Sequence, residues 1–476
     1  MICIIFIKCT ILYNKVINST LMYIVMIKMP LQIAKLEIKD PLKCFSALKK
    51  HYKNCFLLES AVRGDLRLSR YSFIGFDPET LIEIKNNIAK INGKRQRIDN
   101  PFELLEKYSK KYTCDAQFPY IGGLVGYISY DAIRYIEKIP DACKDDLELP
   151  DILLGLYTDG IIIDRFSNTT YYFSLNGFRI NEIENILKKE IKINNKTGIN
   201  KITNKIGKKE FEKNVNIAKN YIKKGDIFQV VLSQRFDIDS NTDPFVFYQN
   251  LRELNPSPYM FFLDFNTKII GASPESAVRI VNREIEVNPI AGTRPIGKTI
   301  QEDIKLEKEL RLDPKERAEH IMLVDLARND IGKVAEFGSV EIPDFMKIER
   351  YSHVQHMVSR VTGTLRKDKT SIDGFRATFP AGTVSGAPKI RAMKIIDRIE
   401  NTKRGPYAGC AGYFSTNGNM DFAITIRTAI KKKKYHVQAG AGIVIDSKPE
   451  KEYFECKHKA SAIIEALGGK DEDFSN

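Results

Sequence analysis

The chain has 476 residues, a formal net charge of +14 and a hydrophobic fraction of 43%. This composition excludes fibrous and intrinsically disordered proteins, and the length allows either several domains or one large interlocked unit. The charge could indicate a nucleic-acid-binding protein, but the lysines are spread through asparagine- and isoleucine-rich stretches without a recognition-helix pattern. We therefore expect no nucleic-acid partner, and a positive field would suit a small anionic substrate.

The eight cysteines are scattered and form no CxxC pair, which predicts reduced thiols and a cytoplasmic protein. Residues 1–28 are apolar but are interrupted by lysines and asparagines, so they do not predict a membrane span and we expect no membrane partner. A signal sequence is one alternative; a start codon assigned too early, with the real start near Met22 or Met29, is favoured over it. Residues 1–30 are accordingly treated as an N-terminal extension outside the fold.

From 31 to 193, short runs of alternating β-branched and aromatic residues predict antiparallel strands, followed by one helix. The polar run 194–209 is predicted to be a linker. In the second domain, 210–470, blocks of strands surround a predicted long helix from about 300 to 328, and a helix closes the chain. Strands in blocks, rather than in strict alternation with helices, predict an α+β fold.

Two predicted helices carry pairs of glutamates. Glu316 and Glu319 share a face of the first helix, and Glu452, Glu455 and Lys459 share a face of the last. If the two helices converge, their carboxylates could bind one Mg²⁺ ion together with an anionic ligand. The alternative is a solvated acidic face that the helix dipole favours.

Three further segments could bind anions. Residues 440–442, Gly-Ala-Gly, could bring backbone N–H groups to an anion or could form a β-bulge. Arg427 lies inside the apolar stretch "AITIRTAI", predicted to be a strand, and needs an anionic partner, either a substrate carboxylate or an internal acid. Gly382 and Thr383 precede a predicted helix and could form an anion site or only a turn and cap.

The stretch "RYSHVQHMVSRVTG" places His353 and His356 three residues apart. Its alternation predicts a strand, in which the two side chains face opposite ways, so at most one of them reaches a pocket. The sequence lacks the P-loop, dinucleotide-binding, GxSxG and HExxH motifs, which removes support for nucleotide-binding, serine hydrolase and zinc protease functions. Carboxylates for a metal and groups for anions together favour a small polyanionic substrate.

Many motifs in order, among them "NPSPYMFF", "GASPES", "PIAGTRP", "ERAEHIMLVDLARNDIG", "FPAGTVSGAPKIRAM" and "VQAGAGIVIDS", resemble the chorismate-utilising enzymes, specifically the large component of anthranilate synthase. The resemblance runs from about Lys208 to Leu467, and "FLLES" with "RYSFIGFDP" extends it towards the N-terminus. It implies large antiparallel β-sheets packed with surrounding helices around a cleft. It also implies conversion of chorismate and ammonia into anthranilate and pyruvate, the first committed step of tryptophan biosynthesis, with Mg²⁺ as cofactor.

The resemblance also implies roles for individual residues. Mg²⁺ is expected at Glu319 and Glu455, with Glu452 nearby. The expected catalytic residues are His356, tied to the loss of pyruvate, and Thr383, Glu316 and Gln229. The residues expected to contact chorismate are Gly292, Thr293, Tyr407, Arg427, Gly440, Ala441, Gly442 and Lys459.

Two positions bear on the nucleophile. Isochorismate-forming relatives carry a lysine where this chain has Gln229, and aminodeoxychorismate synthases typically carry one where it has Ala291. Because both lysines are absent, the resemblance implies an external amine. No "GxCxGxQ"-like glutaminase elbow is present, so ammonia is expected from a separate glutamine amidotransferase subunit, in a heterotetramer of two large and two small subunits, or from free ammonia at high pH. The alternative activity is that of the aminodeoxychorismate synthase component of folate biosynthesis.

Finally, part of the sequence resembles a pocket for feedback inhibition by tryptophan. The alternative is a structural turn, which Pro-Ser-Pro would form in any protein. The residues of this expected pocket are Glu59, Ser60, Asn255, Pro258, Tyr259 and Met260.

Overall fold

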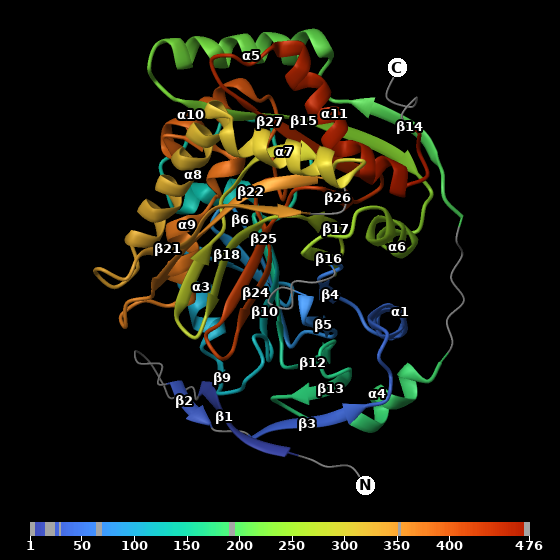
Figure 1. The fold of residues 1–476 in the computed structure, drawn as a ribbon. Coiled ribbons are helices and arrows are strands. Elements are labelled where there is room, and N and C mark those ends of the chain that lie inside the picture. Colours follow the sequence, from blue (N-terminus) through green and yellow to red (C-terminus); the bar gives the residue numbers. More distant parts are fainter. Residues whose placement is uncertain are drawn as a thin grey trace.

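Two large antiparallel sheets form the centre of the molecule (Figure 1). The structure is a computed structural model that describes residues 5–14, 24–27, 30–62, 69–189, 196–350 and 354–470. The main path of the first sheet runs in the order β14 (Ile199–Asn204), β15 (Gln229–Ser240), β27 (Tyr435–Ile443), β26 (Thr428–Lys431), β17 (Lys268–Ser273), β16 (Tyr259–Asp264), β4 (Cys55–Glu59), β5 (Tyr71–Gly75), β12 (Asp159–Asp164), β13 (Thr169–Ser174), β3 (Pro30–Leu36), β1 (Ile5–Asn14) and β2 (Ile24–Ile27).

Two short strands join this sheet off its main path, β23 (Gly386–Ala387) beside β15 and β9 (Tyr112–Cys114) beside β1. The second sheet runs in the order β20 (Ile290–Pro295), β22 (Val354–Thr364), β19 (Glu284–Val287), β18 (Ser276–Val281), β25 (Met420–Ile424), β24 (Cys410–Ser415), β10 (Gly123–Ile128), β11 (Ile152–Tyr157), β6 (Thr80–Lys85), β7 (Ile88–Ile91) and β8 (Lys94–Arg97), with β21 (Glu341–Arg350) beside β22.

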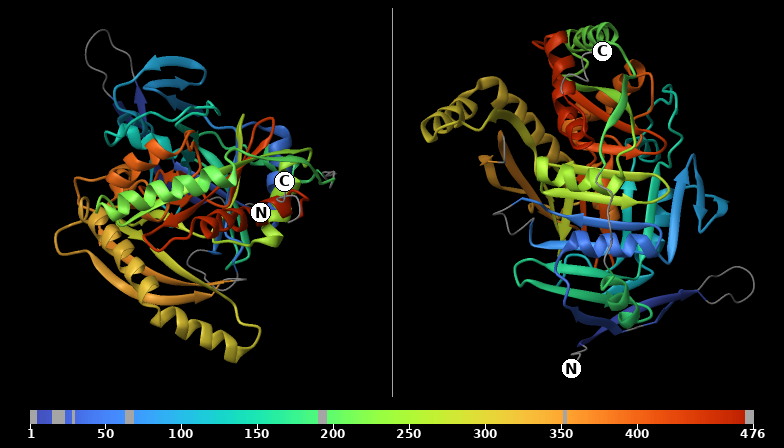
Figure 2. Two further views of the ribbon diagram at one scale, coloured as in Figure 1. Left: turned by 90° about the horizontal axis from the view of Figure 1, so that it is seen from above. Right: turned by 90° about the vertical axis from the view of Figure 1, so that its right-hand side faces the viewer.

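Helices cover the outer faces of both sheets. The α-helices are α1 (Pro41–His51), α3 (Pro101–Ser109), α4 (Ile180–Leu187), α5 (Lys208–Lys223), α6 (Pro244–Leu254), α7 (Ile300–Leu312), α8 (Pro314–Gly332), α9 (Ser371–Thr378), α10 (Lys389–Ile399) and α11 (Pro449–Ala466), and two 3₁₀ turns are η1 (Tyr130–Tyr135) and η2 (Gly382–Val384). Figure 2 shows α7, in yellow, projecting from one side of the molecule. None of the helices in the described part of the chain is long and apolar enough to cross a membrane.

Two hydrophobic cores hold these layers together. One core lies where the sheets face each other, with Phe73 of the first sheet packed against Tyr413 of the second, and it continues on the other face of the second sheet, where Phe414 and Phe422 contact Phe375 of α9. The other joins the first sheet to α1, α4, α5, α6, α10 and α11. The arrangement confirms the predicted α+β fold of large antiparallel sheets with surrounding helices.

The two sheets do not divide at the predicted domain boundary. β4, from the first half of the chain, pairs with β16, so that Glu59 lies opposite Met260, and β10 pairs with β24 of the second half. Residues 199–204 of the predicted linker form β14, which pairs with β15. In the stretch expected to lie outside the fold, residues 5–14 form β1, which pairs with β3 and β9. The two halves are thus interlocked through shared sheets.

The predicted long helix from 300 to 328 is wrong in one respect: it is two helices, α7 and α8, separated at Asp313. Asp313 adopts an extended backbone conformation, and its side chain accepts hydrogen bonds from the N–H groups of Lys315 and Glu316. Pro314 has no N–H to donate to the preceding helix, so the Asp-Pro pair ends α7 and begins α8. The same Asp-Pro start opens α1 and α6.

Gly123 gives a test of the packing between strands. Its φ is +125°, and a Cβ there would lie 2.2 Å from the carbonyl oxygen of Phe414 on the neighbouring strand. Gly123→Ala should lower the free energy of unfolding by more than about 3 kcal/mol, because a backbone atom cannot move aside without breaking the ladder. The control is Gly93→Ala, where φ is +86° but no atom lies within 4 Å; we expect about 1 kcal/mol there. Equal losses in urea denaturation would contradict the steric argument.

Candidate active site

The expected substrate-binding residues gather at one end of β15 and β27. The register places Gly440 opposite Ser233 and Gly442 opposite Val231. A Cβ at Gly440 would lie 2.6 Å from the hydroxyl oxygen of Tyr407, and one at Gly442 would lie 2.7 Å from Nε2 of Gln229. Because the two glycines have no Cβ atom, the side chains of Tyr407 and Gln229 can lie against the strand surface.

Helices α8 and α11 bring their glutamates to this end of the ladder. Gln229 Nε2 donates to Glu319 Oε1 at 2.6 Å, and Lys459 Nζ contacts both Glu455 Oε1 at 2.6 Å and the carbonyl oxygen of Gly440 at 2.9 Å. Burial raises the pKa of Glu319; the hydrogen bond from Gln229 opposes this, and the charges of Glu316 and Glu455 raise the pKa further. The two helices, which the sequence could not place relative to each other, thus converge, and their carboxylates repel one another.

Glu316 and Glu452 flank this pair. Arg294 Nη1 donates to Glu316 Oε1 at 3.2 Å and so shares the charge of that carboxylate. Burial raises the pKa of Glu452, and the charge of Glu455 raises it further. Both glutamates therefore lie within electrostatic reach of the Glu319 and Glu455 pair.

The described residues contain no group of three or more histidine, cysteine or acidic side chains arranged around one metal position. Mg²⁺ is commonly bound by one or two protein carboxylates, with water and a ligand completing the coordination. Glu319 and Glu455 supply hard oxygen atoms, and their mutual repulsion would be relieved by a cation. The donor set therefore fits Mg²⁺.

Residues 292–294, with the sequence Gly-Thr-Arg, lie beside His356. In the pairing of β20 with β22, Thr293 is opposite His356, with a bulge at Gly292, where φ is +69°. His356 Nδ1 lies 3.0 Å from Thr293 Oγ1 and 3.2 Å from the carbonyl oxygen of Gly292. Burial lowers the pKa of His356, and the positive charges of Arg427 and Lys459 lower it further. A neutral imidazole therefore faces two cations. The expected strand is confirmed, while His353 lies outside the described residues.

Arg427 does not lie inside a continuous strand, so that prediction is wrong. β25 ends at Ile424, β26 begins at Thr428, and Arg427 between them has a left-handed φ of 50°. A non-glycine residue in this conformation costs about 1 kcal/mol and is found preferentially at functional sites. The guanidinium is half-buried and forms no hydrogen bond or ion pair with any residue that the structure describes, so it is available to an anion.

The sequence did not predict that Glu275 belongs to this site. Glu275 lies between β17 and β18, accepts a hydrogen bond from Thr383 Oγ1 at 2.7 Å, and is influenced by the charge of Lys459. Burial raises the pKa of Glu275 to about 7. The only signal in the sequence was the motif "GASPES", which gives no indication that its glutamate is buried. Thr383 lies in the 3₁₀ turn η2. The short strand β23 separates this turn from α10, so Thr383 is not at the N-terminus of that helix.

Four of the six residues expected to bind tryptophan line a separate pocket. Glu59, Pro258, Tyr259 and Met260 line it, together with residues of β5, β24 and β25. Ser60 is buried beside β4, and its hydroxyl has no hydrogen-bond partner among the described residues. Asn255, which caps the end of α6, does not line the cavity.

Glu59 is the most constrained residue of that wall. Its side chain accepts hydrogen bonds from Tyr248 at 2.8 Å, from Arg252 at 2.8 Å, and from Arg165. Both carboxylate oxygens are therefore occupied by groups of the protein, whereas the hydroxyl groups of Ser60 and Tyr259 have no hydrogen-bond partner among the described residues.

The fold and the convergent glutamates are features that comparison with known families assigns to one class of protein. The family model described as chorismate binding enzyme matches residues 53–465, and the chain belongs to this family. Within it, the chain groups with the anthranilate synthase component 1 proteins, as the resemblance predicted. It is 46% identical over 439 residues to the component 1 of Methanothermobacter marburgensis, covering 91% of this chain and 94% of the relative. It is 44% identical over 464 residues to that of Acetivibrio thermocellus, covering 90% and 93%.

Solved structures agree with these relatives. Anthranilate synthase component I from Streptococcus pneumoniae aligns with a TM-score of 0.78 and 38% identity, over 83% of this chain and 92% of that one. MenF, the menaquinone-specific isochorismate synthase from Escherichia coli, aligns with a TM-score of 0.70 at 17% identity, over 92% and 94%, and this likeness concerns the fold alone.

The pKa of Glu275 gives a test of its burial. Its pKa of about 7 lies above the ordinary 4.5, so the folded protein holds an extra proton between these values. The free energy of unfolding should therefore fall as pH rises from 4.5 to 7, by up to roughly 3 kcal/mol from this group. In Glu275→Gln this contribution should disappear. The check is urea denaturation of both proteins across that range, and an unchanged difference between them at all pH values would contradict it.

Proposed function

We propose that this chain converts chorismate and ammonia into anthranilate and pyruvate, with Mg²⁺ as cofactor. The observation that carries the proposal is the guanidinium of Arg427, which has no hydrogen-bond or ion-pair partner among the described residues and whose charge acts on His356 beside the convergent glutamates. Chorismate carries two carboxylates, so its binding requires both a cation for one and a metal or backbone N–H groups for the other. The relatives named above support this activity, and they do not favour the aminodeoxychorismate synthase alternative.

The protein groups divide the work of binding. Arg427, Tyr407 and the backbone of Gly440, Ala441 and Gly442 would hold the substrate carboxylates, and Gly292 and Thr293 would border the ring. Lys459 would hold Glu455 in place and add a positive charge. Gln229 would orient Glu319 through its hydrogen bond.

Mg²⁺ would be held by Glu319 and Glu455, with Glu316 and Glu452 in supporting positions. When bound, it would stabilise the charge that develops as the C4 hydroxyl leaves the ring. Glu275 retains a proton near neutral pH and, oriented by Thr383, can donate it to that hydroxyl. His356, neutral and next to Thr293, can accept a proton during the loss of pyruvate.

The nucleophile would be ammonia from outside the chain. Neither Gln229 nor the buried Ala291 offers an amine. The relatives carry the name component 1, which supports a separate amidotransferase subunit as the source of ammonia. We propose two large and two small subunits, a cytoplasmic location and feedback inhibition by tryptophan.

The metal assignment is tested on α11. The purified chain with chorismate, Mg²⁺ and ammonium should produce the fluorescence of anthranilate. Glu455→Gln should lower kcat by at least about 100-fold, because the metal loses a charged ligand. Glu450→Gln is the matched control, since Glu450 lies on the same helix but is exposed and paired with Lys208; it should keep the activity. Full activity in Glu455→Gln would refute the assignment.

The inhibitor pocket is tested at Ser60. Its buried hydroxyl has no hydrogen-bond partner among the described residues, and we propose that a charged group of tryptophan pairs with it. Ser60→Ala should raise the tryptophan concentration for half-inhibition about tenfold, the size of a lost hydrogen bond to a charged group. Inhibition is measured relative to the uninhibited rate of each variant. Ser46→Ala, a buried serine of α1, is the control. Equal inhibition of both variants would place the inhibitor elsewhere.

A further inference from the structure

One edge of β15, next to the substrate site, is closed by side chains instead of a neighbouring strand. β14 pairs with β15 only from Phe236 onwards, and β23 pairs only with Gln229 and Val230. On this side, no strand in the described part of the chain pairs with residues 231–235. A buried backbone group without a partner costs about as much free energy as a lost hydrogen bond, so this stretch needs other partners.

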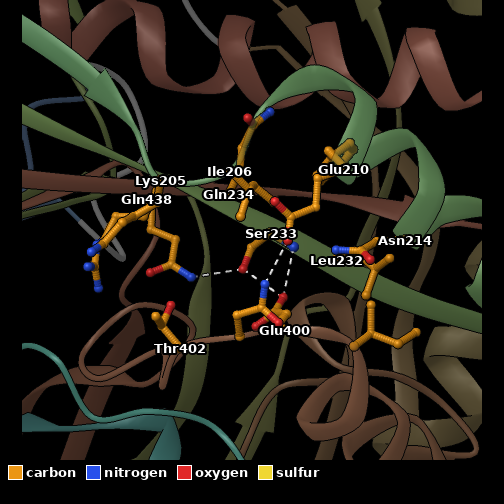
Figure 3. A pocket seen from close by; sticks show the side chains of 14 residues that line it. Lys205, Ile206, Glu210, Asn214, Leu232, Ser233, Gln234, Glu400, Thr402 and Gln438 are labelled. Carbon is orange, nitrogen blue, oxygen red and sulfur yellow. Dashed lines mark hydrogen bonds between the residues drawn. The ribbon is translucent and has the colours of Figure 1, made fainter.

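Two charged side chains supply those partners. Arg404 Nη2 donates to the carbonyl oxygen of Val231 at 2.7 Å. Glu400 Oε1 accepts hydrogen bonds from the backbone N–H and from the hydroxyl of Ser233, both at 2.8 Å (Figure 3). Arg404 also donates to both carboxylate oxygens of Glu400, each at 2.8 Å, in a bidentate pair. The ion pair therefore takes the place of a strand along this part of β15.

Arg404 is almost completely enclosed by the protein. Its side chain is 1% exposed, and its guanidinium lies 4.7 Å from the ring centre of Tyr130. A planar guanidinium that is buried, paired with a carboxylate and stacked on a ring has little freedom to move. Whatever else it contacts is therefore held in a fixed position relative to β15.

The other contacts of Arg404 are with residues beside the proposed reaction. Its Nη1 donates to the carbonyl oxygen of Val384 at 2.8 Å. Val384 follows Thr383 in η2, and the hydroxyl of Thr383 donates to Glu275 at 2.7 Å. The guanidinium also lies 5.7 Å from the ring centre of Tyr407, within the range of a cation–π interaction. One side chain thus contacts the turn that orients Glu275 and the ring of an expected substrate-binding residue.

The strand ladder reaches the same tyrosine from its other end. Ser233, which Glu400 holds, lies opposite Gly440 on β27 and also accepts a hydrogen bond from Gln438 Nε2 at 2.8 Å (Figure 3). A Cβ at Gly440 would lie 2.6 Å from the hydroxyl oxygen of Tyr407. The ion pair therefore fixes both the ring of Tyr407 and the strand surface under its hydroxyl.

We infer that Arg404 is a positioning residue for the proposed reaction, which sets the places of Tyr407, Thr383 and the edge of β15 relative to one another. The inference rests on the proposed function, since it concerns residues to which that function gives roles. Lysine would keep the charge, but its single nitrogen cannot reproduce the directions in which the guanidinium donates.

The test compares Arg404→Lys with Arg235→Lys in the complete chain. Arg235 is the matched control because it is an equally buried arginine of β15, 2% exposed, whose ion pairs are with Asp146 and Asp237. Arg404→Lys should raise the KM for chorismate at least about fivefold, through Tyr407, and lower kcat at least about tenfold, through Thr383. Arg235→Lys should lower the melting temperature and leave both kinetic constants unchanged.

A double-mutant cycle separates positioning from a purely structural role. An arginine that only stabilised the fold would change the number of folded molecules, and those molecules would keep the ordinary KM. If Arg404 acts through Tyr407, Arg404→Lys should raise the KM less than about twofold in a Tyr407→Phe background, because the group that it positions is already gone. An equal rise of KM in both backgrounds would overturn the inference.

Tyr130→Leu is the second variant, since it removes the ring beside the guanidinium and leaves the ion pair intact. It should raise the KM for chorismate at least about twofold. Folding is followed by near-ultraviolet circular dichroism, and Tyr130→Leu decides if Arg404→Lys does not fold. Unchanged kinetic constants in the folded variant would overturn the inference while the proposed function stands. If the unaltered chain forms no anthranilate from chorismate and ammonium, both are refuted.

Discussion

The pairing of β15 with β27 is the constraint on which the rest of the site depends. It fixes Gly440 and Gly442 opposite Ser233 and Val231, and the glycines leave the space that Tyr407 and Gln229 fill. Any larger residue at either glycine would meet a polar atom closer than 3 Å. The strands therefore act as a surface against which helices from distant parts of the chain place their charged side chains.

Electrostatics then decides which groups are charged. The Glu319 and Glu455 carboxylates are brought together against their repulsion, and a cation between them would relieve the cost. Burial lowers the pKa of His356, the charges of Arg427 and Lys459 lower it further, and burial keeps a proton on Glu275 near neutral pH. Carboxylates and cations thus lie close together, with Lys459 paired to Glu455, an arrangement suited to a substrate with two carboxylates and a leaving hydroxyl.

Much of the fold could be predicted because the signals were local. The alternation in "TLIEIK" predicted β6, and the alternation in "RYSHVQHMVSRVTG" predicted the strand β22. The predictions failed where neighbours in space decide the backbone. In the sequence, the stretch around Arg427 resembles one continuous strand because the flanking residues are apolar. In the structure the strand is interrupted there: the backbone of Arg427 has a left-handed φ and is hydrogen-bonded to β17. β14 looked like a linker because both its faces are polar.

The sequence by itself determined the residue types of the site, their spacing along helices and strands, and the family to which the chain belongs, because each of these is a property of contiguous motifs. Only the tertiary structure decided that α8 and α11 converge, that Arg427 has no partner in the described part of the chain, and that Glu275 is buried next to Thr383. These are relations between residues separated by more than a hundred positions, and they arise from strand pairing and desolvation, which no local pattern records.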